Sequence, residues 1–120
     1  MTYLYIFIGG GLGSLARFLV SKTTASFFTM NFPIGSFISN ILSCVILAIL
    51  VLFLANKHGE FTWVQPLLIV GFCGGFSTFS TFSNETFNLL STGHIAIALL
   101  NICLSLAVGI GLIFILRAKV

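Results

Sequence analysis

Four long apolar runs, separated by short polar segments, dominate the chain; they cover residues 4–20, 34–55, 63–90 and 95–116. A helix needs roughly 20 apolar residues to cross the hydrocarbon core of a bilayer. The apolar positions in each run are continuous, whereas the strands of a membrane β-barrel alternate in segments of about ten residues. The pattern therefore predicts an all-α membrane protein with four transmembrane helices.

The segments between the runs predict the connections. Residues 23–32 form the first predicted loop, which ends at Pro33, a residue favoured in the first turn of a helix. Residues 56–60 and 91–94 predict two short polar turns. Residues 1–120 are therefore predicted to form a single four-helix transmembrane domain. No basic segment or cleavage site precedes the first run, so its helix is expected to stay in the mature chain.

Composition supports a membrane protein and excludes other classes. Hydrophobic residues make up 58% of the chain and charged residues only 6%, whereas a soluble domain is about 25% charged. The net charge of +3 comes from dispersed Lys and Arg residues, which form no basic patch for a nucleic acid. Cys44, Cys73 and Cys103 lie inside apolar runs and predict packing residues rather than a disulfide.

The third run differs from the others because residues 71–85 contain three glycines and many Ser and Thr residues. Glycine lowers helix propensity by about 1 kcal/mol relative to alanine, and hydroxyl side chains compete for backbone hydrogen bonds. We expect this helix to be broken near its middle, at residues 74–78. Such a break presents oppositely charged helix ends near the membrane midplane and can build a site; a plain kink is the structural alternative.

Loop charges predict the topology. With four helices, both termini lie on one side of the membrane, together with Lys57, Arg117 and Lys119. The other side holds Lys22, with Arg17 nearby. Because the positive-inside bias is weak, the chain is expected to insert in both orientations. This suggests an antiparallel dimer of opposite topologies.

Polar residues inside the runs are the candidate functional residues. Arg17 either reaches to the membrane interface or attracts ions electrostatically at a pore mouth. Asn40 lies four residues after Ser36 on one helical face and either joins two helices or lines a site. Glu85 is the only acid inside a run. It is either a proton or cation site or a buried acceptor that orients nearby hydroxyls.

A hydroxyl-rich track runs along the third run. Thr78, Thr81 and Glu85 recur at helical spacing and share one face. Phe79 and Phe82 interleave with this track, and the positive edge of an aromatic ring can contact an anion. Packing is the structural alternative for both rings. A donor-rich track without Lys or Arg predicts a pathway for a small solute, since conduction needs sites that bind weakly.

Two glycine pairs predict close helix contacts, and several enzyme motifs are missing from the sequence. Gly9 and Gly13, and likewise Gly71 and Gly75, have the GxxxG spacing that permits close helix approach. No zinc spacing, catalytic triad, phosphate loop or dinucleotide fingerprint is present in the sequence. The sequence therefore predicts a protein that is not an enzyme.

Three motifs resemble the Fluc (CrcB) fluoride-channel family. They are GGxxGxxxRF from Gly9 to Phe18, PxGSxxxN from Pro33 to Asn40, and GFCGGFSTFSTF from Gly71 to Phe82. The resemblance covers all four runs, and the third motif is the most specific. Ser36 and Ser77 stand where Thr is common in the family, and Phe18 stands where Tyr is common; each keeps the hydroxyl or the ring.

The resemblance implies a bacterial inner-membrane, multi-pass channel that exports fluoride passively and reduces its toxicity. It further implies an antiparallel dual-topology homodimer in the lipid bilayer, with two pores. The pore residues matched by the resemblance are Phe79, Phe82, Asn40, Ser80, Thr81 and Glu85, and Arg17 matches a vestibule residue. Gly74 and Ser77 match a break whose backbone carbonyls, from both subunits, hold a central structural sodium ion.

The residues themselves agree with this function. Ring edges, hydroxyls and an amide suit a small anion, and several donors together can replace the water around strongly hydrated fluoride. We expect a narrow, neutral pore to reject chloride by its size. A heterodimer with a paired homologue remains an open alternative to the homodimer.

Two other functions compete with the channel. A small multidrug-type, proton-coupled exporter is also a short four-helix dual-topology dimer, but it needs a carboxylate in the first transmembrane helix. The first run here contains no acid. A non-transporting assembly subunit would explain the glycine pairs, but not the concentration of breaking residues and hydroxyls in the third run.

Overall fold

The computed structural model describes residues 1–27, 32–55, 57 and 59–118, and the described part is all-helical. In chain order the helices are α1 (Thr2–Phe27), α2 (Ile34–Ala55), η1 (Gln65–Cys73), α3 (Gly74–Phe76), α4 (Phe79–Ser91) and α5 (Ile95–Ala118). Four stretches are long and apolar enough to cross a membrane: Thr2–Phe27, Ile34–Ala55, Gln65–Ser91 and Ile95–Ala118. This confirms the prediction of an all-α protein with four membrane-spanning helices.

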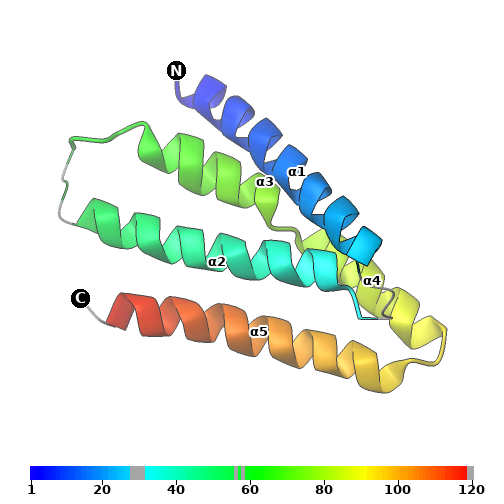
Figure 1. Ribbon diagram of the computed structural model, residues 1–120. Helices are drawn as coiled ribbons and strands as arrows, with labels where there is room; N and C mark the ends of the chain where they lie inside the picture. Colours follow the sequence, from blue (N-terminus) through cyan, green and yellow to red (C-terminus); the bar gives the residue numbers. More distant parts are fainter. Residues whose placement is uncertain (28–31, 56, 58, 119–120) are drawn as a thin grey trace.

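The helices form an elongated bundle (Figure 1). The start of α1 and the end of α5 lie toward the same end of the bundle (Figure 1), as expected for four antiparallel spans. Helix α2 runs alongside α5, and α1 lies against η1 and α3. The third span is the exception to a simple bundle, because it consists of η1, α3 and α4 in succession.

The prediction of a loop over residues 23–32 is wrong for its first part, because α1 continues to Phe27. The polar side chains that indicated a loop bond back to their own helix instead. The hydroxyl of Thr24 donates to the carbonyl of Val20 at 2.9 Å, and that of Ser26 donates to Lys22 O at 3.1 Å. These bonds satisfy the hydroxyls without leaving the helical conformation. His58, within the predicted turn over residues 56–60, and Lys119, one of the charges used to predict the topology, lie outside the described residues.

The glycine pairs are where α1 meets the third span, and they confirm the predicted close approach. A Cβ on Gly9 would clash with the carbonyl oxygen of Leu67, and one on Gly13 would clash with the carbonyl oxygen of Phe72. On the opposing helix, a Cβ on Gly75 would lie 2.5 Å from the carbonyl oxygen of Gly10. The two backbones therefore pack directly on one another, which only glycine permits.

One polar pair, Asn101 and Thr86, joins α5 to α4. The amide of Asn101, which is buried, donates to the hydroxyl of Thr86 at 3.2 Å and accepts from the hydroxyl of Ser105 at 3.2 Å. The hydroxyl of Thr86 in turn donates to the carbonyl of Phe82 at 2.8 Å. Every group in this series of hydrogen bonds has a partner. The series therefore joins the two helices and leaves none of its own buried polar atoms unpaired.

Candidate functional site

The third span changes conformation at residues 77–78, which we call the 77–78 linker. Helix α3 ends at Phe76, and Ser77 has φ −91° and ψ 157°. Thr78 is also extended, with φ −154° and ψ 123°, and α4 begins at Phe79. The linker frees backbone groups that a continuous helix would satisfy internally. In a membrane each of these groups needs another partner.

Asn40 on α2 provides two of those partners. Its side-chain oxygen accepts from the backbone N–H of Thr78 at 2.8 Å, and its amide nitrogen donates to the carbonyl of Thr78 at 3.4 Å. The Thr78 hydroxyl accepts from the backbone N–H of Thr81 at 3.2 Å and so caps the start of α4. One side chain from a different span therefore fixes the position of the linker.

Arg17 on α1 supports the same region from the other side. Its guanidinium Nε donates to the carbonyl of Gly75 at 3.1 Å. The hydroxyls of Ser43 and Ser77 both donate to the carbonyl of Cys73, at 3.1 and 2.7 Å. The segment before the linker is thus bonded to α1 and α2, and the half-buried Arg17 places a positive charge beside it.

The linker borders a cavity of about 270 Å³ between α2, α4 and α5, which we call the ring cavity. It is lined by Asn40, Cys44, Ser77, Thr78, Phe79, Phe82, Ser105 and Leu106. The centroids of the Phe79 and Phe82 rings lie 6.1 Å apart, and the ring planes meet at 40°. None of the lining residues is acidic or basic, so the ring cavity is neutral.

The predicted hydroxyls gather at the start of α4. The Thr78 hydroxyl lies 3.2 Å from the Ser80 hydroxyl and donates to the Thr81 hydroxyl at 3.3 Å. Ser80 and Phe79 are exposed in the single chain, and 79% of the Phe79 side chain is uncovered. This part of the site therefore faces outward from the chain, where lipid or a second molecule can cover it.

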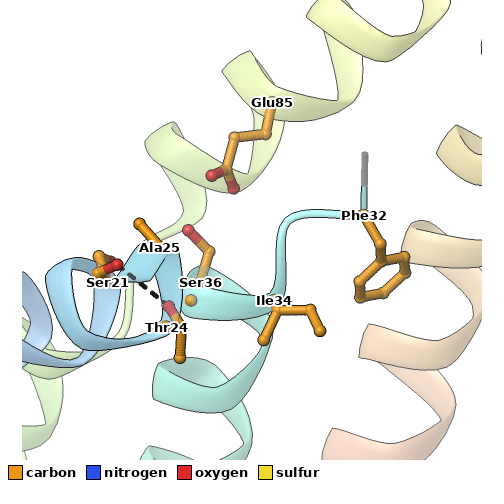
Figure 2. Close-up of a pocket in the computed structure, with 8 residues that line it drawn as sticks. Ser21, Thr24, Ala25, Phe32, Ile34, Ser36 and Glu85 are labelled. Carbon is orange, nitrogen blue, oxygen red and sulfur yellow. Dashed lines mark hydrogen bonds between the residues drawn. The ribbon is translucent and has the colours of Figure 1, made fainter. Parts of the chain in front are cut away.

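Glu85 does not line the ring cavity. It borders a second cavity of about 230 Å³, the Glu85 cavity, together with Ser21, Thr24, Ala25, Phe32, Ile34, Gly35 and Ser36. Figure 2 shows the Glu85 carboxylate pointing from α4 toward the hydroxyl of Ser36. The structure thus brings Asn40, Phe79 and Phe82 together and places the carboxylate in separate surroundings. The grouping of all these residues on one pathway stays a prediction.

Comparison with known proteins gives the family. Residues 4–116 match the family described as CrcB-like protein, Camphor Resistance (CrcB). The chain belongs to the CrcB family. This confirms the resemblance seen in the three sequence motifs, and together with the four spans it makes the protein a multi-pass membrane protein.

Members of the CrcB family with curated names are similar over most of their length. A protein of Coxiella burnetii (strain CbuK_Q154) is 42% identical over 92% of this chain and 90% of its own length. One of Flavobacterium psychrophilum is 38% identical over 91% and 88%, and one of Pyrococcus abyssi is 41% identical over 94% and 90%. All three are named fluoride-specific ion channel FluC.

For this CrcB-family chain, the surroundings of Gly74 and Ser77 fit a hard cation such as sodium. In a continuing α-helix the N–H of Thr78 would bond to the carbonyl of Gly74, but here it donates to Asn40. A Cβ on Gly74 would meet nothing within 4 Å, so this residue faces open space. The described residues contain no cluster of His, Cys, Asp or Glu that could hold a metal ion. A cation at this position would need carbonyl or hydroxyl oxygens, which hard cations accept as ligands.

Sequence reasoning missed two residues of this CrcB-family site. Ser43 bonds to the backbone before the linker, and Ser105 lines the ring cavity from α5. Ser105 carries a usable signal, because it follows Asn101 by four residues in an otherwise apolar run and so shares its helical face. Ser43 carries a signal of the same kind, because it follows Ser39 by four residues and Ser36 by seven and so shares their helical face.

Proposed function

We propose that the protein is a fluoride-selective channel, and not an enzyme, that lets fluoride leave the cell passively across the bacterial inner membrane and so reduces its toxicity. The observation that carries this proposal is the similarity, over nine tenths of the chain, to proteins named fluoride-specific ion channels. The neutral ring cavity beside the 77–78 linker is consistent with it, because the ring edges and the Asn40 amide that line it suit a small anion.

The proposed pathway passes the ring cavity. The edges of the Phe79 and Phe82 rings carry partial positive charge, and the start of α4 carries the positive end of its helix dipole. Asn40, Ser80 and Thr81 add amide and hydroxyl donors. Together these groups replace water around fluoride without a full positive charge, so the ion is admitted and also released.

In the same proposal, Arg17 raises the local concentration of anions near the vestibule, and Glu85 lies farther along α4 on the fluoride pathway. The bond from Arg17 to the carbonyl of Gly75 holds its charge beside the linker. The guanidinium keeps its full positive charge while its Nε–H donates to Gly75, so it can still attract anions.

The functional unit in this proposal is an antiparallel homodimer with two pores. The exposure of Phe79, at 79%, supports a second chain as its cover. The carbonyls near Gly74 and Ser77 from both subunits would hold one structural sodium ion, which would fix the two chains against each other. Backbone carbonyl oxygens of both chains would be its ligands.

Fluoride release from liposomes tests the function. Purified protein is reconstituted into vesicles loaded with fluoride, and release is followed with a fluoride electrode beside a matched chloride-release assay. Fast fluoride release with no chloride release is the expected result. Equal fluoride and chloride rates would contradict selectivity, and no fluoride release from a well-folded dimer would contradict the channel.

A further inference from the structure

The Glu85 cavity contains a carboxylate that faces no positively charged side chain among the residues lining this cavity. Oε1 of Glu85 is buried and accepts no hydrogen bond. None of the residues that line the cavity is Lys, Arg or His. A carboxylate taken out of water without a partner is costly. Glu85 also borders a neighbouring cavity that includes His94, whose ring Nδ1 lies 3.0 Å from the hydroxyl of Thr92.

The hydroxyls of this cavity offer lone pairs. Thr24 donates its proton to its own helix, at 2.9 Å to the carbonyl of Val20 and at 3.0 Å to that of Ser21 (Figure 2). Its oxygen can therefore only offer lone pairs to a ligand. Ser21 and Ser36 line the same cavity and add two more hydroxyl oxygens. An oxygen set of this kind coordinates a hard cation.

Helix ends point to the same conclusion. Ser21, Thr24 and Ala25 belong to the last two turns of α1, the end that carries partial negative charge. The first turn of α2, which includes Ser36, carries partial positive charge, and the Glu85 carboxylate faces it. The carboxylate therefore already occupies the position beside the positive end of α2 where an anion would bind. A second anion would be repelled, whereas a cation would be attracted by both Glu85 and the end of α1.

We propose that the Glu85 cavity binds a hydrated monovalent hard cation, Na⁺ in particular, through the Glu85 carboxylate and the hydroxyls of Ser21, Thr24 and Ser36. A volume of about 230 Å³ leaves room for the ion and several waters, since a water takes about 30 Å³ in the liquid. One carboxylate balances one charge, which favours a monovalent over a divalent ion. The site is distinct from the sodium proposed near Gly74 and Ser77.

The site has a consequence that rests on the proposed channel function. An unpaired carboxylate repels fluoride, whereas a carboxylate paired with Na⁺ presents no net charge. Cation binding at Glu85 would therefore ease the passage of fluoride along α4. Binding itself does not depend on conduction, so it is measured on the purified protein.

Sodium-dependent thermal unfolding of the purified protein in detergent tests the proposal. NaCl replaces N-methylglucamine chloride at constant ionic strength, and the apparent sodium affinity is taken from the rise in Tm. The part of the Tm rise that is due to the Glu85 cavity should change in Glu85→Gln. We expect it to need a roughly tenfold higher sodium concentration, or to disappear, as when residues that support a metal site are changed. Glu60→Gln is the matched control, because Glu60 is exposed in a turn and should respond like the unaltered protein.

A second pair of variants covers the case in which Glu85→Gln fails to fold. Ser21→Ala removes one cavity hydroxyl and should weaken the sodium response, while Ser26→Ala on the exposed face of α1 should not. An unchanged sodium response in both Glu85→Gln and Ser21→Ala would overturn the proposal. Fluoride release by the unaltered protein, measured in parallel, separates this outcome from failure of the proposed channel function.

Discussion

The two halves of the third span are held in opposite ways. Its first half, η1 and α3, packs on α1 through glycines whose missing side chains let the backbones touch. The 77–78 linker and α4, in contrast, are held by polar side chains from α2 and α5. At Gly71 and Gly75 the first half leaves no room for a side chain against α1, whereas the second half borders the ring cavity and the Glu85 cavity.

This difference assigns stability mainly to the first half of the third span and transport mainly to the second half. Backbone contact at glycines is rigid and tolerates no added atom, so it positions the linker reliably. Polar side chains fix the linker at a few points and leave cavities between those points. We therefore expect changes in the first half to affect folding, and changes in the second half to affect transport.

The largest expected effect is at the glycine contact. Gly13→Ala would push a methyl group into the carbonyl of Phe72 and should lower the stability of the folded protein by about 2 kcal/mol or more, as for overpacked cores. Thermal unfolding in detergent measures the loss. Gly11→Ala is the control, because a Cβ there meets nothing within 4 Å. Equal stability of the two variants would contradict the steric role of Gly13.

Asn40 sharpens the comparison because two substitutions separate its roles. Asn40→Ala removes both bonds to Thr78 and should cost about 1–3 kcal/mol of stability, the penalty for an unpaired buried group. Asn40→Asp keeps the acceptor for the N–H of Thr78 but adds a negative charge beside the ring cavity. It should stay more stable than Asn40→Ala and yet lose most fluoride release. Normal release by Asn40→Asp would contradict an anion pathway past Asn40.

Phe82→Ile tests the ring edge with little effect on folding. The substitution keeps apolar bulk but removes the ring edge from the ring cavity, so fluoride release should fall while the proposed dimer persists. Phe87→Ile on the same helix is the control, since Phe87 is 64% exposed and lines none of the cavities described above. Vesicle release assays and size-exclusion chromatography measure the two quantities. Undiminished release by Phe82→Ile would count against the ring-edge contact.

The smallest expected effect is at Arg17. Arg17→Gln retains a donor for the carbonyl of Gly75 and removes only the charge, so stability should change by about 1 kcal/mol or less. Fluoride release should fall at low ionic strength and approach that of the unaltered protein at high salt, where charges are screened. Fluoride release from vesicles at several salt concentrations measures this. A deficit that is the same at every ionic strength would exclude electrostatic attraction as the role of Arg17.

Composition predicted the spans well, because crossing a bilayer depends on the length and hydrophobicity of one segment at a time. The error over residues 23–27 arose because Thr24 and Ser26 look like loop residues but bond to their own helix. The glycine pairs were also readable from their spacing. Residues 77–78 overlap the segment where a break was predicted, since glycine and hydroxyl residues weaken helices locally.

By itself, the sequence determined four membrane-spanning helices, the glycine contact surfaces and the residues able to carry chemistry. Only the tertiary structure decided the partners of those residues: Asn40 bonds to Thr78, 38 positions away, and Arg17 to Gly75, 58 positions away. It also separated Glu85 from the ring cavity. Local propensity acts within a few residues of the chain, whereas such pairings depend on the rotation and depth of whole helices against each other.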